Sequence, residues 1–447
     1  MKKFFRQYKN FVHASQGVLA EIYYGLPYKK LKFIAVTGTD GKTTTTQLIE
    51  HILQKNNFKV AYLSTISAKI NGMEYETGLH VTSPDPWILP KFLRLMVQKN
   101  VEFIVLEVTS QGLVQNRTIM IPFDASVITN IKSDHLDYHG TWENYAEAKF
   151  KIIENTMANG LIVLNKDDEK SAKWLSKKLM ITKTKNKILS WISESDISSF
   201  EQNTEGMEFD YEGQHFKIPL IGKFNIDNVL AAIKVAQRYL PLEAIAQGLL
   251  TFTTPIGRME VVSRQPGMVI IDFAHTPNAL LNALKTVSEI KPPNGKIICV
   301  YGCAGKRDKA RRQMGAISAK LADISILTAE DPRDEKLKDI NSEIFDYAKA
   351  EGAEMVNRFK NNLDYKKVDI AKIKERIKNS TNPLFYSFDE DNINSRIDAI
   401  DFALRLAQKH DVVYLTGKAH EKSLVFGEDE KPWSEHEVVS SKMCEIL

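Results

Sequence analysis

The chain has 447 residues, of which 43% are hydrophobic, and a net charge of +4 from 60 basic and 56 acidic side chains. This length predicts two or three domains, and charges spread along the chain give no reason to expect a nucleic-acid partner. Three cysteines are too few for a disulfide framework or a zinc quartet, and the sequence has neither an apolar run of membrane-spanning length nor a signal-peptide pattern. We therefore expect a cytoplasmic protein.

Residues 1–31 are predicted to form a basic amphipathic segment ahead of the first domain. Its basic side chains face a single acid, Glu21, and apolar residues recur near helical spacing from Phe4 to Ile22. One interpretation is peripheral docking on an anionic membrane surface. The other is a helix packed on its own domain with its lysines in solvent, which is favoured because apolar helix faces are usually core.

The next element is a strand at Phe33–Val36, followed by a glycine-rich turn and a helix that begins near Thr44. A strand, a glycine turn, a lysine and a hydroxyl at a helix start form a phosphate cradle. Lys42 would add a charge near the β- and γ-phosphates, and the Thr43 hydroxyl is placed to hold Mg²⁺. The stretch predicts binding of a nucleoside triphosphate such as ATP. It departs from the standard spacing, because Val36 stands where that pattern has glycine.

Strands and helices then alternate, which predicts an α/β fold with sheets covered on both faces. Expected strands and helices in the first domain are Val60–Ser64, Phe103–Val108, Ala125–Thr129, Leu161–Leu164, and the helices Glu143–Asn155 and Asn225–Tyr239. A proline–glycine break at Thr254–Gly257 predicts a boundary. We therefore expect a central P-loop-type ATPase domain with a mostly parallel sheet at 32–255, followed by a Rossmann-like α/β domain at 256–447.

The second domain repeats the same rhythm. The expected strands are Val269–Phe273, Ile297–Tyr301, Ile324–Thr328, Leu384–Phe388 and Val412–Thr416, with helices at Asn278–Ile290 and Ile393–Lys409.

A cluster of histidines and aspartates follows the strand that ends at Thr129. It runs from Asn130 to Thr141 and includes His135, where open α/β sheets place their ligands. Glu107 ends a neighbouring strand, and a carboxylate at that edge is favourable beside a cation. These residues predict that a metal ion or a phosphate binds at this edge of the sheet. The alternative, which is typical of such clusters, is a loop held by its own hydrogen bonds.

Ten motifs in the same order resemble the Mur ligases, and among them the UDP-N-acetylmuramoyl-tripeptide synthetases. They are GTDGKTTT at Gly38, TSP at Thr82, EVTSQGLVQNR at Glu107, NIKSDHLDYHGT at Asn130, the Tyr145–Lys149 helix, GRME at Gly257, DFAHTPNAL at Asp272, GKRDKARRQMG at Gly305, EDPRDE at Glu330 and GKAHE at Gly417. The resemblance implies an ADP-forming ligase that phosphorylates a peptide carboxylate with ATP and then joins an amine to the acyl phosphate. Lys42, Glu107, His135 and Lys149 would be catalytic, and Thr43, Glu107, His135 and Lys149 would hold Mg²⁺.

The resemblance further implies that Lys149 reacts with CO₂ to give a carbamate, N6-carboxylysine, because a free ammonium would repel Mg²⁺. It implies an ATP site made of the loop and of residues farther along the chain: Gly38, Thr39, Asp40, Gly41, Lys42, Thr43, Thr44, Asn225, Asn228, Arg258, Asp272, His275, Arg307 and Asp308. Taken alone, Asn225 and Asp308 are also suited to cap helices.

The substrates implied are a muramoyl dipeptide and a diamino acid. The protein is expected to act as a monomer. The implied substrate-binding residues are Thr82, Ser83, Ser110, Gln115, Arg117, Glu330, Asp331, Arg333, Gly417 and Glu421. Arg333 would pair with the distal carboxylate of meso-diaminopimelate, a bidentate geometry that lysine does not supply. Asp331 stands where the family pattern has asparagine, and an added carboxylate would favour a distal ammonium, so lysine remains an alternative amine.

Two more departures leave the acceptor open. The family's usual uridine-diphosphate domain is expected to be missing, because Lys42 comes so early, and Gln111 stands where these synthetases usually have histidine. The alternatives are a related ligase with a lipid-linked or other acceptor, such as an amidating subunit or a folate polyglutamylating enzyme, and an inactive nucleotide-binding module. The lack of a four-cysteine insertion argues against the amidating subunit, and the HTPNAL and EDPR motifs argue against folate.

Overall fold

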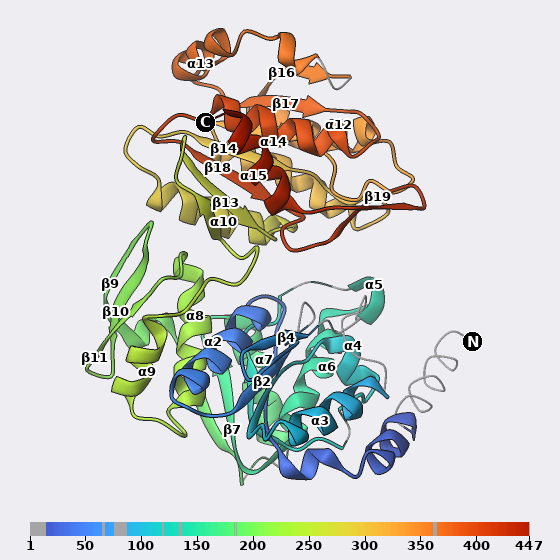
Figure 1. Cartoon of the computed structure of the whole chain (residues 1–447), viewed down its shortest axis with the longest axis vertical. Helices are drawn as coiled ribbons and strands as arrows, with labels where there is room; N and C mark the ends of the chain where they lie inside the picture. Colours follow the sequence, from blue (N-terminus) through green and yellow to red (C-terminus); the bar gives the residue numbers. More distant parts are fainter. Residues whose placement is uncertain are drawn as a thin grey trace. The chain divides into compact units, whose positions relative to one another are not determined.

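The computed structural model describes residues 15–64, 68–75, 87–118, 120–132, 134, 136–182, 184, 186–360 and 364–446. The chain divides into two compact units (Figure 1). The first comprises residues 1–201, 206–220 and 224–253, and the second comprises 202–205, 221–223 and 254–447.

The first unit is built on an eight-stranded sheet in the order β4-β3-β2-β5-β1-β6-β7-β8. The strands are β1 Lys32–Thr37, β2 Val60–Leu63, β3 Ala68–Ile70, β4 Met73–Tyr75, β5 Phe103–Glu107, β6 Phe123–Ile128, β7 Thr156–Asn165 and β8 Ile188–Ile192. All neighbours pair in parallel except β2–β3 and β3–β4. Because β5 and β6 flank β1 on opposite sides, the carboxyl end of β1 is the point where the strand order reverses and ligands are expected.

Helices cover both faces of this sheet. They are needed on both because successive side chains of β1 point to opposite faces and all of them from Phe33 to Val36 are apolar. Ile34 and Val36 point to one core and Phe33 and Ala35 to the other. Figure 1 shows the helices around the sheet: residues 15–23, α2 Lys42–Lys55, α3 Ile88–Gln98, α4 Ser110–Val114, α5 Leu136–His139, α6 Trp142–Glu154, α7 Glu169–Ile181, α8 Ile226–Ala236 and α9 Leu242–Leu249. Helices α2, α8 and α9 fill the first core, and α3 and α6 the second.

A three-stranded antiparallel sheet completes the first core, with the order β11-β10-β9. Its strands are β9 Ile197–Asn203, β10 Gly206–Tyr211 and β11 Gln214–Ile218. Short 3₁₀ turns lie at η1 Pro27–Lys30, η2 Glu194–Asp196 and η3 Lys223–Asn225.

The second unit has a seven-stranded sheet in the order β12-β13-β18-β14-β15-β17-β16, parallel except for β12. Its strands are β12 Glu260–Ser263, β13 Met268–Asp272, β14 Ile297–Tyr301, β15 Ile324–Leu327, β16 Glu354–Phe359, β17 Leu384–Phe388 and β18 Val412–Thr416, with a separate hairpin of β19 Ser423–Phe426 and β20 Asp429–Pro432. Its helices are α10 Pro277–Ile290, η4 Lys309–Gln313, α11 Met314–Leu321, α12 Leu337–Lys349, η5 Tyr365–Lys367, α13 Ile370–Asn379, α14 Asn394–Leu406 and α15 Glu435–Ile446. Helices α10, α11 and α12 bury one face, and α14 and α15 bury the other.

The predicted α/β class with mostly parallel sheets is confirmed. Each strand expected from the sequence is present, with ends that differ from the prediction by at most a few residues. The prediction succeeds because a strand buried on both faces has a continuous apolar run. The antiparallel sheet β9–β11 is an addition that the sequence pattern does not predict. Its exposed face carries polar residues between apolar ones, so it lacks the continuous run that marks the parallel strands.

Candidate active site

The predicted phosphate loop lies between β1 and α2, at the carboxyl edge of the sheet. Gly41 is the residue before α2 and has φ +80°, and Lys42, Thr43 and Thr44 form the first turn of the helix. Thr43 and Thr44 are each 5% exposed. The helix therefore begins with free backbone N–H groups and a positive dipole end directed toward the loop, which suits phosphate.

Gly38 and Gly41 of the loop are required because neighbouring side chains lie very close to their Cα atoms. A Cβ added to Gly38 would lie 1.8 Å from Thr129 Oγ1, and one added to Gly41 would lie 2.0 Å from Asn228 Oδ1. Neither position accepts a side chain without movement of its neighbours.

Gly41→Ala is expected to destabilise the first unit and weaken nucleotide binding. The left-handed conformation costs alanine about 1–2 kcal/mol, and overpacking against Asn228 adds about 1–3 kcal/mol. The matched control is Gly213→Ala, because Gly213 has the same φ of +80° and no atom within 4 Å of an added Cβ. Thermal unfolding and ADP titration of both variants would measure the difference, and equal losses would show that the contact with Asn228 is unimportant.

The carboxyl end of β6 holds the loop from the side. Thr129 Oγ1 donates to Asp40 O at 2.6 Å, Asp40 N–H donates to Asn130 Oδ1 at 2.9 Å, and Asn130 Nδ2 donates to Asp40 O at 3.2 Å. Thr39 N–H donates to Asn130 O at 3.0 Å. The loop conformation is thus fixed by hydrogen bonds to a neighbouring strand end.

Lys42 and Thr43 begin α2 with different partners. Lys42 Nζ donates to Thr39 O at 2.8 Å, so its charge lies over the loop. Thr43 Oγ1 donates to Glu107 Oε2 at 2.9 Å, and Glu107 ends the adjacent strand β5 with 8% exposure. The structure therefore brings together a hydroxyl and a carboxylate, the oxygen ligands that Mg²⁺ prefers.

Lys149 lies on α6 and reaches the same loop. Its Nζ is 2.5 Å from Gly38 O and 4.5 Å from the centre of the Tyr145 ring, and the residue is 1% exposed. Burial, assisted by the charge of Lys42, lowers the pKa of Lys149 well below its usual value, against the opposing carboxylates of Asp134, Asp40 and Glu107. This burial excludes a solvent-exposed position for the Lys149 side chain.

The histidine and aspartate cluster is only partly described. His135 lies outside the described residues, as do Thr82 and Ser83. The described histidine of the cluster, His139, is buried, and its Nε2 lies 2.9 Å from Oγ of Ser110, which is also buried. Ser110, at the start of α4, thus lies beside the cluster, while Arg117 Nε donates to Gln115 Oε1 at 2.7 Å just after α4. No group of three or more His, Cys, Asp or Glu side chains among the described residues has the arrangement of a metal site.

Asn225 and Asn228 support the loop from behind α2. Asn228 Oδ1 accepts from Thr45 Oγ1 at 3.2 Å, and Asn228 Nδ2 donates to Asn225 Oδ1 at 2.9 Å. Asn225 stands at the N-cap of α8, but its side chain makes no capping bond to the helix. Together these asparagines fix the contact that excludes a side chain at Gly41.

In the second unit, Asp272, His275 and Arg258 gather at the carboxyl end of β13. Asp272 Oδ2 accepts from Tyr414 OH at 2.7 Å and Oδ1 from Met259 N–H at 3.1 Å. His275 Nδ1 lies 3.0 Å from Phe273 O, and the Arg258 guanidinium lies 4.8 Å from the Phe273 ring centre. The structure thus groups three residues that the sequence placed at the ATP site.

His420 completes this group, although the sequence did not single it out. Its ring lies 4.7 Å from that of Phe273, and its Nδ1 is buried without a hydrogen-bond partner in the described structure. Burial, with the charges of Arg258, His275 and Lys418, lowers the pKa of His420 to about 3, so the imidazole is neutral near pH 7.

Arg307 and Asp308 lie in the exposed loop after β14. Asp308 Oδ1 accepts from Ala310 N–H at 2.9 Å and caps η4. Its observed contact is therefore that of a helix cap, the alternative role named for it above. Arg307 is exposed and free to meet a ligand of the second unit.

The predicted amine-binding residues converge on a lysine that the sequence did not single out. Lys418 is 1% exposed, and its Nζ lies 2.8 Å from Asp331 Oδ1 and 2.5 Å from Glu421 Oε2. Asp331 Oδ1 also accepts from Val425 N–H at 3.0 Å. The carboxylate of Asp331 is therefore compensated within the protein, which weakens the argument that it repels a distal carboxylate.

Glu330 lies beside this ion pair in a buried position. It is 6% exposed, burial raises its pKa to about 8 against Arg311 and Lys418, and its Oε2 has no hydrogen-bond partner in the described structure. A Cβ added at Gly417, which has φ +104°, would lie 3.2 Å from Glu330 Cγ. Glu330 is thus mostly a neutral acid at pH 7.

Arg333 has left-handed backbone geometry, with φ 54°, and Asp331 has φ 48°. Two such non-glycine residues in one loop cost free energy and are typical of functional sites. Backbone bonds from Arg333 N–H to Val425 O at 3.2 Å and from Gly427 N–H to Arg333 O at 2.8 Å hold the loop against β19. The guanidinium forms no ion pair with any described carboxylate, so it is available to a carboxylate ligand.

Sequence reasoning missed the supporting residues Thr129, Tyr145, Lys418 and His420. Each lies within or beside a quoted motif, and the motif is the only signal that could have drawn attention to it. Their contacts are made across the fold, between residues far apart in the chain.

Both parts of the chain match families of known proteins. Residues 36–236 match the Mur ligase middle domain, and residues 257–372 match the Mur ligase, glutamate ligase domain. The UDP-N-acetylmuramoyl-L-alanyl-D-glutamate–2,6-diaminopimelate ligase of Clostridium perfringens is 34% identical over 434 residues, 95% of this chain and 80% of the relative. The ligase of the same name from Clostridium botulinum is 32% identical over 442 residues, 96% of this chain and 81% of the relative.

A solved structure of a UDP-N-acetylmuramoyl-L-alanyl-D-glutamate–2,6-diaminopimelate ligase superimposes with a TM-score of 0.62 and 26% identity, over 93% of this chain and 79% of that one. No described helix of this chain is long and apolar enough to cross a membrane. With both domain matches and relatives above 30% identity along nearly its whole length, the chain belongs to the Mur ligase family.

Proposed function

We propose that this Mur ligase uses ATP to join meso-diaminopimelate to the D-glutamate carboxylate of a muramoyl dipeptide in peptidoglycan synthesis. The observation that carries the proposal is the convergence of Lys42, Thr43, Glu107 and Lys149 on one phosphate loop, in a chain whose relatives bear the name of that ligase. An acceptor carboxylate oxygen attacks the γ-phosphorus and ADP leaves. The amine nitrogen then attacks the acyl carbon, phosphate leaves, and the amine releases a proton.

The residues of the chain position and neutralise charge in this scheme. The N-terminus of α2 and Lys42 bind the phosphates of ATP, because transfer of a phosphoryl group depends mainly on alignment and charge stabilisation. Arg258, Asp272, His275, Arg307 and Asp308 of the second unit are proposed to bind ATP as well. Thr82, Ser83, Ser110, Gln115 and Arg117 are proposed to bind the muramoyl dipeptide.

Mg²⁺ and a carbamate on Lys149 belong to the same proposal. Thr43, Glu107, His135 and the carbamate would hold the metal ion, which neutralises phosphate charge when bound. The hydroxyl–carboxylate pair of Thr43 and Glu107 fits such an ion. Burial of Lys149 favours its neutral amine, whose nitrogen bonds to the carbon of CO₂ and releases one proton to give an N-carboxylate.

One assay tests the function. The protein is incubated with ATP, Mg²⁺, one acceptor and one amine, and ADP and product mass are measured. The acceptor is UDP-MurNAc-dipeptide or a lipid-linked dipeptide, and the amine is meso-diaminopimelate or L-lysine. A product heavier by one diaminopimelate residue is expected. Turnover with lysine alone would reassign the amine, turnover only with a lipid-linked or other acceptor would reassign the acceptor, and no ATP turnover would favour an inactive nucleotide-binding module.

We also propose peripheral membrane contact by the helix at 15–23, with the chain acting as a monomer. Leu19 and Ile22 are each 59% exposed and Tyr23 is 75% exposed, at helical spacing on one face. The Tyr23 ring lies 6.0 Å from that of Trp87, which is 40% exposed. Exposed Lys29, Lys30, Lys91 and Arg94 on η1 and α3 supply positive charge, which complements an anionic bilayer.

Ile22→Glu is expected to reduce binding to phosphatidylglycerol vesicles about tenfold, because it removes apolar contact and adds a repelled charge. Met180→Glu is the control, since Met180 is 84% exposed on α7. Vesicle co-sedimentation, with neutral phosphatidylcholine vesicles for comparison, measures binding. Equal binding of the two variants would contradict the membrane proposal, and light scattering of the protein in solution would test the monomer.

A further inference from the structure

Two loops that carry expected binding residues leave adjacent strands at the same edge of the second sheet. Residues 302–308 follow β14 and include Arg307 and Asp308, and residues 328–336 follow β15 and include Asp331 and Arg333. The strands pair in parallel, with Tyr301 beside Leu327. Because parallel strands end at one edge, the two loops begin side by side.

Their backbones are in direct contact. Gly305 N–H donates to Asp331 O at 3.0 Å, and a Cβ added to Gly305 would lie 1.9 Å from Pro332 O. Lys306 also pairs with Asp334 through its ammonium. The position of one loop therefore constrains the other.

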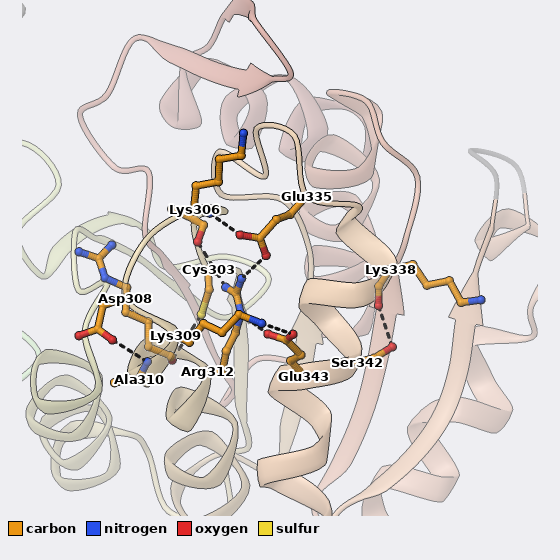
Figure 2. A network of polar contacts seen from close by, with 12 residues as sticks. Cys303, Lys306, Asp308, Lys309, Ala310, Arg312, Glu335, Lys338, Ser342 and Glu343 are labelled. Carbon is orange, nitrogen blue, oxygen red and sulfur yellow. Dashed lines mark hydrogen bonds and ion pairs between the residues drawn. The ribbon is translucent and has the colours of Figure 1, made fainter.

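Glu335 bridges the loops with both carboxylate oxygens. Its Oε1 accepts from the backbone N–H of Lys306, in the first loop, and its Oε2 accepts from Arg312 Nη2 at 3.2 Å (Figure 2). One side chain of the second loop thus holds the first loop and the 3₁₀ turn that follows it.

Arg312 is the buried centre of this network. It is 3% exposed, and its guanidinium also reaches Ala304 O at 3.4 Å. Its Nε donates to Glu343 Oε2 on α12 at 3.3 Å (Figure 2). Three acceptors in different directions fit the planar fork of arginine, and the single ammonium of lysine cannot serve all three. A buried guanidinium without its carboxylates would be costly, so the network favours one arrangement of the two loops.

We propose that Arg312 and Glu335 are positioning residues, which set the spacing between the loop of Arg307 and Asp308 and the loop of Asp331 and Arg333. They contact neither ATP nor the amine themselves. This inference rests on the proposed function, since the amine whose binding they set is that of the ligase reaction. Small displacements of binding groups have large effects on the formation of a reactive complex.

Glu335→Gln tests the proposal, because glutamine keeps the shape of the side chain and removes its charge. We expect the KM for meso-diaminopimelate to rise about 5- to 20-fold with kcat changed less than about threefold. Arg312→Lys is expected to give a similar rise, and the double variant no more than either single one, because both act through one contact. Lys309→Gln is the matched control. Lys309 is 71% exposed, and its ammonium pairs with Glu343 on α12.

Hydrogen–deuterium exchange gives a readout that needs no turnover. Glu335 accepts from Lys306 N–H and from Arg312 Nη2 with two different oxygens, whereas glutamine has a single acceptor oxygen, so Glu335→Gln cannot keep both bonds. Exchange of the peptide that spans 303–308 should therefore be at least about tenfold faster, while Lys309→Gln leaves it unchanged. Unchanged exchange in a folded Glu335→Gln variant would overturn the positioning role. Faster exchange with an unchanged KM would overturn its importance for the amine, whereas a parent protein without ligase turnover would overturn the proposed function alone.

Discussion

Lys149→Ala is expected to lower the rate of ATP-dependent ligation on the order of 100- to 1,000-fold, the size of effect seen when one preorganised electrostatic group is removed. The side chain reaches Gly38 at the base of the phosphate loop and is 1% exposed. ADP release in the presence of both substrates measures the loss.

A carboxylate in solution should restore part of this activity if Lys149 acts as a carbamate. Short-chain carboxylic acids such as formate or acetate can enter the space left by the alanine and supply the missing oxygens. Lys151→Ala, on the same helix, is the control, because Lys151 Nζ donates to Leu113 O at 3.4 Å away from the phosphate loop. Undiminished turnover by Lys149→Ala would disprove the carbamate, and a loss without rescue would point to a role for the amine itself.

Arg333→Ala should reduce kcat/KM for meso-diaminopimelate by about 2–4 kcal/mol, which is about 30- to 1,000-fold, the range for a lost charge-assisted pair. The guanidinium has no described carboxylate partner, and its loop is held in strained geometry by β19. Use of L-lysine, which lacks the distal carboxylate, should change little. Steady-state kinetics with both amines decide the matter, since equal losses would make Arg333 a structural residue.

Arg333→Lys is the sharper control, because lysine keeps the charge but cannot form a bidentate pair.

Asp331→Asn addresses the departure from the family pattern. The sequence alone predicts a gain in diaminopimelate preference, but Lys418 already neutralises Asp331, and asparagine Oδ1 can still accept from Val425 N–H. We therefore expect a change of less than about threefold in the amine preference.

The sequence by itself determined the class of the fold, the phosphate loop and the family. Parallel strands buried on both faces have continuous apolar runs, and the glycine, lysine and threonine of the loop act through local backbone geometry. Such features depend on neighbours in the chain, so the amino-acid order alone is enough to assign Phe33–Val36, Gly41, Lys42 and Thr43.

Only the tertiary structure decided how charges are compensated. The motif alone leaves the Asp331 carboxylate free to select the amine, yet it pairs with Lys418, 87 residues away. Lys149 is buried against Gly38, 111 residues away, and Arg312 joins two loops through Glu335. The energy of a charge depends on its burial and on its partners, and both are set by which strand ends and helices the fold brings together, not by adjacent residues.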